Sequence, residues 1–262
     1  MQMTLKQKYG QWALVTGASS GIGRAFARHL AAEGMNVILV ARRKDRLQQL
    51  AVELQEKHAV QALAVALDLT SEGFMPELAE QVGSRDVGLL INNAGFGSVG
   101  FFADNDPEHE ANMVRLHCLA TTALAHHFIR PMLQRGKGGI IFVGSIVGVL
   151  PIPYIATYSA TKAFDMFIGQ ALWYEMRGKG IDVLALAPGG TKTEFQRLTR
   201  EPESPLAASP EAVVRTGMRA LGKRPYVIHG WHNKFVAFCA RFLPAKITLQ
   251  LIGGFASRNM NI

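Results

Sequence analysis

Short apolar runs alternate with helix-forming stretches along most of this 262-residue chain, and this alternation constrains the fold more than any other feature. The runs are WALVT (12–16), NVILVA (36–41), QALAVALDL, DVGLLINNAG, GGIIFVGS, IDVLALAPG and YVIH (226–229). Two of the intervening stretches, about 107–135 and 154–178, are long and helical in pattern. Strands separated by helices are typically parallel and joined by right-handed crossovers. The sequence therefore predicts an α/β fold with a doubly wound parallel sheet in three α/β/α layers.

The net charge of +8 belongs entirely to the C-terminal fifth of the chain. Residues 1–211 hold 20 basic and 20 acidic side chains, whereas residues 212–262 hold 8 basic ones and no acid. The aromatic residues Trp231, Phe235 and Phe238 share this segment, which Pro244 divides in two. Two interpretations stay open: the segment packs its apolar face on the domain, or it binds anionic lipid or an acidic ligand. Nucleic acid is not expected, because no recognised binding motif accompanies the charge.

We expect a cytoplasmic protein, with peripheral membrane contact through the tail as an addition. Cys118 and Cys239 have no metal-ligand spacing and lie in apolar stretches, so we interpret both as reduced packing residues. No cluster of Cys, His and carboxylate residues predicts a metal site. The first 17 residues do not resemble a signal peptide, and no apolar run reaches the length of about 18 residues that a membrane span needs.

The stretch TGASSGIG (16–23) follows the first predicted strand and opens the first predicted helix. Its glycines Gly17, Gly21 and Gly23 permit a tight turn, and the helix amino terminus offers free N–H groups to a pyrophosphate. This turn predicts dinucleotide binding on a Rossmann-type sheet. The second strand ends in VARRKDRL, where Arg42 and Arg43 suit a ribose 2′-phosphate and no acid is present to bind a 2′-hydroxyl. We therefore expect NADP(H) in preference to NAD(H), with Arg42 as the first candidate.

Four motifs taken in order resemble the short-chain dehydrogenase/reductase family. They are TGASSGIG, NNAG (92–95), Ser145 with YSATK (158–162), and PGGTKT (188–193). The resemblance covers roughly residues 10–195, and it is specific because several separate motifs recur in order. It implies an NADP-preferring oxidoreductase. The cofactor residues that it implies, together with those of the turn, are Gly17, Ser19, Ser20, Gly21, Ile22, Gly23, Arg42, Arg43, Asp68, Leu69, Asn92, Ala94, Gly95, Tyr158, Lys162, Pro188, Gly189, Thr191 and Thr193.

Tyr158 and Lys162 are four positions apart, about one helical turn, so the phenol and the ammonium share a helix face. Carbonyl reduction needs a proton donor to the developing alkoxide and a donor that polarises the oxygen. A free phenol has a pKa of about 10, and a nearby lysine cation lowers it. The resemblance implies that Tyr158 is the general acid/base, that Lys162 tunes its pKa and that Ser145 orients the substrate oxygen. Tyr154 is a rival phenol without a lysine four residues later.

One position departs from the family pattern. Alignment of MVRLHCLATTAL with the family's long fourth helix places His117 where an asparagine usually helps to hold a water beside the lysine. Two interpretations stay open. The imidazole relays protons near neutral pH as a fourth catalytic residue, or His117 only packs there and the relay differs or is absent.

The leading functional hypothesis is an NADP(H)-dependent oxidoreductase that acts on a small apolar carbonyl or alcohol substrate. The alternatives are a 3-oxoacyl or steroid reductase with a membrane-surface tail, and a low-turnover NADP-binding regulator. The candidate pocket walls are Phe96, Val147, Ile152 and Phe195, and residues 196–210 are expected to form a mobile loop. We expect two units, a dinucleotide-binding and catalytic domain at 1–230 and a helical extension at 231–262. The two long helices predict a homodimer or homotetramer.

Overall fold

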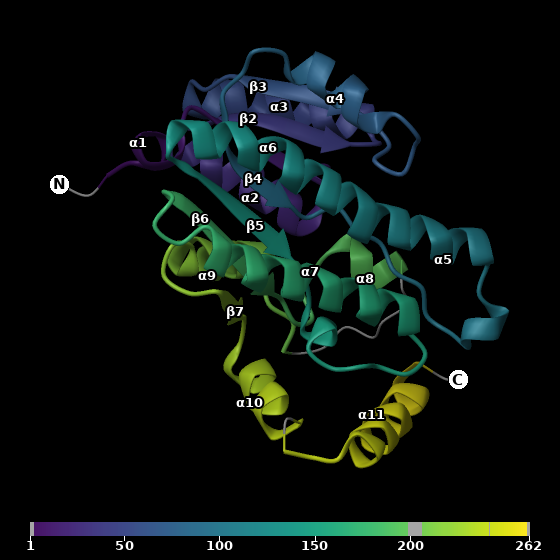
Figure 1. Ribbon diagram of the computed structural model, residues 1–262. Coiled ribbons are helices and arrows are strands. Elements are labelled where there is room, and N and C mark those ends of the chain that lie inside the picture. Colours follow the sequence, from purple (N-terminus) through teal and green to yellow (C-terminus); the bar gives the residue numbers. More distant parts are fainter. Residues whose placement is uncertain (1–2, 199–205, 241, 261–262) are drawn as a thin grey trace.

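The computed structural model describes residues 3–198, 206–240 and 242–260, in which seven strands form one parallel sheet (Figure 1). The strands are β1 (Trp12–Thr16), β2 (Asn36–Ala41), β3 (Ala62–Ala66), β4 (Val87–Asn92), β5 (Gly138–Val143), β6 (Ile181–Ala187) and β7 (Tyr226–Ile228). Their order in the sheet is β3-β2-β1-β4-β5-β6-β7, and every neighbouring pair is parallel. The predicted strands and the doubly wound topology are confirmed.

The central strands are apolar without alternation because helices cover both faces of the sheet. All residues of β1, β4 and β5 are buried. Leu14 of β1 lies between Ile38 of β2 and Leu90 of β4, and its neighbours Ala13 and Val15 point to the opposite face. Continuous burial of this kind is typical of parallel sheets enclosed by crossover helices.

Helices cover the two faces in separate sets. On one face α2 (Gly21–Ala32), α3 (Lys44–His58) and α9 (Pro210–Ala220) surround a core that contains Phe26 and Leu30. On the other face α4 (Phe74–Val82), α6 (Thr121–Arg135) and α7 (Ala156–Glu175) surround a core that contains Leu78 and Phe128. The remaining helical elements are α1 (Leu5–Tyr9), η1 (Phe102–Asp104), α5 (Pro107–Val114), η2 (Arg115–Ala120), η3 (Ile146–Gly148), α8 (Glu194–Leu198), α10 (Trp231–Ala240) and α11 (Ala245–Met260). The predicted three layers are therefore confirmed.

The long helix predicted at 107–135 is continuous but contains a wider turn. It consists of α5, the π-helical segment η2 and α6. Segments with π geometry are uncommon and often occur at functional sites, and this one contains His117. Both α5 and η2 pack against α7, so η2 places His117 next to the helix that carries Tyr158.

The chain order reverses between β1 and β4, which are neighbours at the centre of the sheet. The crossovers from β1 lead toward β3, and those from β4 lead toward β7. Because consecutive connections diverge there, a crevice forms beyond the carboxyl ends of these strands, where doubly wound folds bind ligands. Ser145 and the motifs TGASSGIG, NNAG and PGGTKT lie at or just after the carboxyl ends of strands at this edge, whereas YSATK lies on α7.

The C-terminal helices α10 and α11 hang below the three layers (Figure 1) and bury little of their apolar surface. Trp231 is 77% exposed and Phe238 is 62% exposed. The structure therefore does not show these aromatic side chains packed on the domain. The predicted division of the tail near Pro244 is confirmed, because α10 ends at Ala240 and α11 begins at Ala245. The interpretation of Cys239 as a packing residue was wrong, because it lies exposed on α10.

The loop predicted at 196–210 differs from the structure at both ends. Residues 196–198 belong to α8, which is held by ion pairs of Glu194, and α9 begins at Pro210. Residues 199–205 lie outside the described part of the chain. Within the described part, no helix has the length and apolar character needed to cross a membrane. In that same part, no three His, Cys, Asp or Glu residues are grouped as a metal site requires.

Candidate active site

Two glycines of the TGASSGIG turn allow the chain to bend tightly against β4. Gly17 has φ +66°, and a Cβ there would lie 2.8 Å from Asn93 Nδ2. A Cβ at Gly23 would collide with the carbonyl oxygen of Gly17. Ser20 precedes α2 and its side chain does not cap the helix, so the first N–H groups of α2 stay available to an anion. The turn thus has the backbone geometry that pyrophosphate binding requires.

Thr16 ties the turn to the NNAG motif across the crevice. Its hydroxyl accepts hydrogen bonds from the N–H groups of Asn93 and Ala94, both at 2.9 Å, and donates to the carbonyl of Ile91. Asn93 Nδ2 donates in return to the carbonyl of Thr16 at 2.8 Å. The sequence analysis did not predict this hydrogen-bonding role for Thr16 or Asn93. The signal was present for Thr16, because it ends a buried strand and its hydroxyl therefore needs a partner.

Asn92 and Asn93 point to different places although they are adjacent. The side chain of Asn92 is buried and its Nδ2 lies 3.4 Å from the carbonyl of Thr121, at the start of α6. Its Oδ1 has no hydrogen-bond partner among the described residues. The Asn92 side chain therefore faces the helical layer, whereas Asn93 braces the phosphate turn.

Arg43, rather than Arg42, reaches the phosphate turn. Its Nη2 donates to the hydroxyls of Ser19 and Ser20, both at 2.8 Å. Arg42 is 69% exposed at its side chain, and its Nη1 lies 4.0 Å from Asp68 Oδ2. The other oxygen of Asp68 accepts from the N–H and the hydroxyl of Thr70, which fixes the carboxylate at the end of β3.

Glu194, which directly follows the PGGTKT motif, forms ion pairs with Arg43 and Arg46. Its two oxygens accept from Arg43 Nη1 at 2.7 Å and from Arg46 Nη1 at 2.5 Å. Hydrogen bonds from these two guanidinium groups lower the pKa of Glu194 to about 2, so the carboxylate is ionised over the working pH range. A carboxylate at this position was not predicted, because its partners are about 150 residues away in the chain.

The PGGTKT motif lies against both the turn and the segment of Ser145. The carbonyl of Pro188 accepts from the N–H of Ile146 at 2.8 Å, and Thr191 Oγ1 donates to the carbonyl of Gly189 at 2.9 Å. A Cβ at Gly21 would lie 3.0 Å from the Thr193 methyl group. The motif is therefore in contact with both the glycine turn and the segment that follows Ser145.

Ser145, Tyr158 and Lys162 are brought to one edge by the packing of η3 on α7. Ser145 follows β5, and its hydroxyl accepts from the N–H of Val147 at 3.3 Å as the cap of η3. A Cβ at Gly148 would lie 2.5 Å from the Lys162 carbonyl, so glycine is needed for this contact between η3 and α7. The Tyr158 ring contacts Phe195, with centroids 5.4 Å apart, and His117, with centroids 5.9 Å apart.

Lys162 is buried and its ammonium has two protein partners. Nζ donates to the carbonyl of Val143 and to Asp165 Oδ2, both at 2.9 Å. Both side chains of the ion pair are almost inaccessible, at 6% for Lys162 and 5% for Asp165. Burial raises the pKa of the Asp165 carboxyl, and the Lys162 cation partly offsets this. Sequence reasoning did not identify Asp165.

His117 uses both ring nitrogens within the protein. Nε2 accepts from the N–H of Phe96 at 3.1 Å, and Nδ1 lies 2.9 Å from Thr161 Oγ1. Since that hydroxyl donates to the carbonyl of Tyr158, the Nδ1 proton of a neutral ring completes the chain. Burial, reinforced by the Lys162 cation, holds the pKa of His117 well below its ordinary value. This geometry supports the packing interpretation over the relay.

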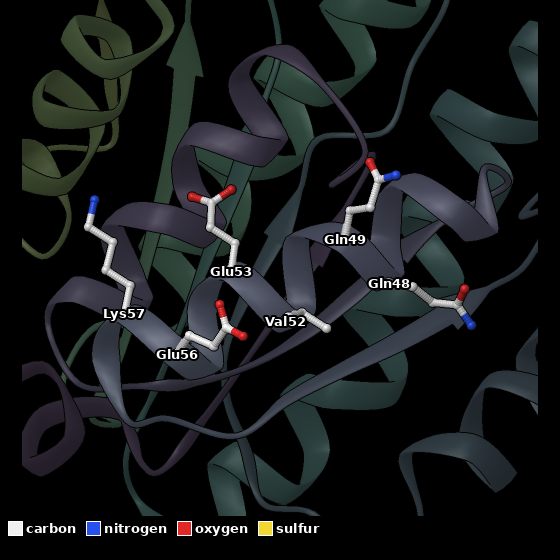
Figure 2. A pocket seen from close by; sticks show the side chains of 6 residues that line it. All are labelled: Gln48, Gln49, Val52, Glu53, Glu56 and Lys57. Carbon is white, nitrogen blue, oxygen red and sulfur yellow. The ribbon is translucent and has the colours of Figure 1, made fainter.

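The surface pocket shown in Figure 2 lies elsewhere. Six side chains that project from α3 line it: Gln48, Gln49, Val52, Glu53, Glu56 and Lys57. Because α3 and α7 cover opposite faces of the sheet, this depression is not part of the site described above. One helix alone forms it, and we assign no ligand to it.

Known proteins are similar to this chain in both sequence and structure. A family model described as short chain dehydrogenase matches residues 11–204. A very-long-chain 3-oxoacyl-CoA reductase of Homo sapiens is 31% identical over 252 residues, covering 92% of this chain and 80% of that protein. A 7beta-hydroxysteroid dehydrogenase of Clostridium sardiniense is 33% identical over 236 residues, covering 88% of this chain and 90% of that one.

Two solved structures extend the comparison. One belongs to a study of 7beta-hydroxysteroid dehydrogenase stereoselectivity; it has a TM-score of 0.90 and 30% identity, and covers 95% of this chain and 99% of that one. A short-chain dehydrogenase from Sphingobium yanoikuyae in complex with NADPH has a TM-score of 0.78 and 32% identity, covering 88% and 93% of the two chains. The first of these matches includes most of the C-terminal extension.

Proposed function

The chain belongs to the short-chain dehydrogenase/reductase family of oxidoreductases, and from this premise we propose that it reduces an apolar ketone, or oxidises the corresponding secondary alcohol, with NADP(H). The observation that carries the proposal is that α7, which bears Tyr158 and Lys162, packs at the end of β5: Lys162 Nζ donates to the carbonyl of Val143 at 2.9 Å, two residues before Ser145. When bound, the nicotinamide supplies or accepts the hydride.

The residues of the crevice fit such a dinucleotide. The closeness of Gly17 to Asn93 leaves no room for a side chain, and the amino terminus of α2 favours a pyrophosphate. Arg43 offers a guanidinium that suits a 2′-phosphate, and Arg42 is a second, more exposed candidate. The solved relative in complex with NADPH supports this preference. In the proposal, Asp68, Leu69, the NNAG turn and the PGGTKT motif form the remaining walls.

The proton transfer is assigned to Tyr158. In reduction its hydroxyl gives a proton to the developing alkoxide, and in oxidation the phenolate removes one. The Lys162 cation on the same helix face favours the phenolate. Ser145 lies at the end of β5 and orients the substrate oxygen through its hydroxyl.

Replacing one tyrosine at a time tests this assignment. Tyr158→Phe should lower kcat at least 100-fold, as expected when a general acid is lost, and should keep NADPH affinity within about threefold. Tyr154→Phe is the matched control, because this neighbouring phenol lacks a lysine one turn later, and it should stay near wild type. Equal turnover of wild type and Tyr158→Phe would refute the assignment. Cofactor binding without turnover in wild type would instead favour the low-turnover regulator.

An apolar substrate is favoured by the aromatic residues beside the acid/base. Phe195 contacts the Tyr158 ring, and Phe96 lies within 6.0 Å of the His117 ring, measured between centroids. Val147 and Ile152 remain proposed walls on the segment after Ser145. The similar proteins named for 3-oxoacyl-CoA and hydroxysteroid substrates make these two classes the specific candidates. A panel of 3-oxoacyl thioesters, steroid ketones and small diketones with NADPH distinguishes them by kcat/KM.

The tail provides a second candidate feature, contact with an anionic membrane surface. Trp231, Phe235 and Phe238 are exposed on α10, and the segment after residue 211 carries eight basic residues and no acid. Exposed aromatics combined with cationic side chains bind the interface of anionic bilayers. Vesicles containing phosphatidylserine should sediment the protein, and Trp231→Ala with Phe238→Ala should reduce this at least fivefold. Phe102→Ala, an exposed aromatic of the domain, is the control; equal loss in both variants would refute the proposal.

A homo-oligomer is proposed through the two long helices. Leu119 of η2 is 64% exposed, and Phe167 and Tyr174 of α7 are also exposed. Apolar side chains of this size on helices that otherwise pack well indicate a covered surface. Sedimentation velocity should show a dimer or tetramer, and Phe167→Glu should shift it toward the monomer. A wild type that is monomeric at micromolar concentration would refute this proposal.

A further inference from the structure

Asp165 forms a buried ion pair with the lysine assigned to the acid/base. Asp165 lies three residues after Lys162 on α7, and Oδ2 accepts from Nζ at 2.9 Å. The pair is shielded from water, so salt and solvent screen it far less than a surface pair. A second acceptor, the carbonyl of Val143, receives another proton of the same ammonium. The lysine is therefore held in place and its charge is balanced.

We propose that Asp165 is a positioning residue that partly neutralises the Lys162 cation, keeps Tyr158 protonated near neutral pH and so favours carbonyl reduction over alcohol oxidation. The inference rests on the proposed function of Tyr158. Its basis is the geometry of the pair: a carboxylate in contact with the ammonium opposes the field by which that ammonium favours a phenolate.

The size of the effect follows from Coulomb's law. Tyr158 and Asp165 are seven residues apart on α7, a rise of about 10 Å along the helix. At an effective dielectric constant near 20, a unit charge at about 10 Å contributes about 1.7 kcal/mol, or a little over one pH unit. A lysine that is paired with a carboxylate retains only part of this influence, because the two charges partly cancel at a third group. Loss of Asp165 should therefore move the ionisation of Tyr158 by about one pH unit toward acid.

Among the charged side chains that the structure describes on α7 and on the elements packed against it, Asp165 is the one paired with Lys162. His117 of η2 contacts the Tyr158 ring, and burial keeps this imidazole neutral. Cys118 of the same segment has its pKa raised to about 11 by burial and by Asp165, so it stays a neutral thiol. The other titratable residues on these elements, and on α8 whose Phe195 contacts the Tyr158 ring, are Glu108, His109 and Glu110 of α5, Arg115 of η2, Asp182 of β6, Glu194 and Arg197 of α8 and Tyr226 of β7. Glu110 is bonded to Ser98 and Asn105, Asp182 to Tyr9, and Glu194 to Arg43.

A role limited to folding is the competing explanation. Removal of one member of a buried ion pair commonly destabilises a protein by several kcal/mol. A purely structural Asp165 would change the melting temperature and the amount of active protein. It would leave the pH at which the remaining active enzyme is half-maximal unchanged, and this difference separates the two explanations.

The experiment measures kcat/KM against pH for oxidation of a secondary alcohol with NADP⁺. Asp165→Asn should move the rising limb of this pH profile about one pH unit toward acid. At any pH below the limb, the fraction of Tyr158 present as phenolate should then be about tenfold higher than in wild type. Asp165→Glu keeps the charge and should restore the limb to the wild-type position. The matched control is Asp182→Asn, which removes a carboxylate paired with Lys8 near the opposite ends of the strands and should not shift the limb.

A second measurement does not require turnover. The tyrosinate absorbance of each protein, minus that of its Tyr158→Phe counterpart, reports ionisation of Tyr158 as pH rises. Asp165→Asn should again ionise at lower pH than wild type. An unchanged or more alkaline midpoint would overturn the inference, whereas absence of turnover in wild type would count against the proposed function alone. If Asp165→Asn does not fold, the wild-type profile decides: an oxidation rate already at its plateau at neutral pH would overturn the inference.

Discussion

Replacement of Arg43 by alanine is the sharpest test of how the protein selects its cofactor. The guanidinium of Arg43 lies against Ser19 and Ser20, at the start of the phosphate turn. Arg42 is its neighbour in sequence, but its Nη1 lies 4.0 Å from Asp68 Oδ2 and its side chain is 69% exposed. The two positions therefore form a matched pair, in which the same substitution removes the same charge from two different places.

The expected losses differ in size. A charge-assisted contact between a half-exposed guanidinium and a phosphate contributes about 2 kcal/mol to binding. Arg43→Ala should therefore raise the dissociation constant for NADPH about 30-fold. NADH lacks the 2′-phosphate, and its affinity should change by less than about threefold. Because Arg42 is well solvated, Arg42→Ala should cost at most about 1 kcal/mol, or about fivefold, for NADPH.

Titration of cofactor fluorescence with each purified variant gives the four dissociation constants. Measurements at low and high salt add a check, since the NADPH loss in Arg43→Ala should shrink as salt screens the contact. Equal weakening of NADPH and NADH in Arg43→Ala would refute the assignment of the 2′-phosphate to this residue. A larger loss in Arg42→Ala than in Arg43→Ala would restore Arg42 as the principal contact.

Three further outcomes follow from contacts in the same region. Glu194→Gln should strengthen NADPH several-fold relative to NADH, because the carboxylate competes with a phosphate for Arg43; fluorescence titration checks this, and an unchanged ratio would contradict it. The pKa of His117 is lowered in the folded state, so its contribution to stability is present above about pH 6.5 and is lost as pH falls below that value. The free energy of unfolding, measured with denaturant, should therefore fall more steeply for wild type than for His117→Asn as pH is lowered from neutral to about 5.5. The difference should be up to about 1.4 kcal/mol per pH unit; an equal pH dependence of the two proteins would refute this. Thr16→Val should lower the free energy of unfolding by about 3 kcal/mol, because it leaves two N–H groups without their acceptor; a loss under about 1 kcal/mol would show that they find other partners.

Much of the fold could be predicted because burial leaves a direct mark on the sequence. The runs WALVT and NVILVA correspond residue for residue to β1 and β2. Helices cover both faces, so the strand interiors are apolar and the polar residues Thr16 and Asn36 stand at strand ends. The short helix α1 was not predicted, although Thr4 and Gln7 form a capping box that the sequence displays. The π-helical segment η2 was not predicted, because nothing in its residues RLHCLA distinguishes it from an ordinary helical turn.

The site was predictable to the extent that its residues lie close together in sequence. Tyr158 and Lys162 share one helix, so their spacing could be interpreted directly. The sequence could not show which of Arg42 and Arg43 reaches the phosphate turn. Adjacent residues at a strand end point to opposite sides, and nothing in the sequence shows which side faces the turn. Glu194 reaches Arg43 across about 150 residues, a contact that only the folded chain defines.

Asp165 shows where the limit lies. A lysine and an aspartate three residues apart on a helix are ordinarily interpreted as a surface pair, worth a few tenths of a kcal/mol. The same pair has a different meaning when β5 supplies the carbonyl of Val143 and η2 closes over it, because water no longer screens the two charges. The residue types and the spacing are visible in sequence, but the dielectric environment is not. The balance of charge around Tyr158 is therefore a property of tertiary packing, and changing Asp165 tests it without touching the groups assigned to the reaction.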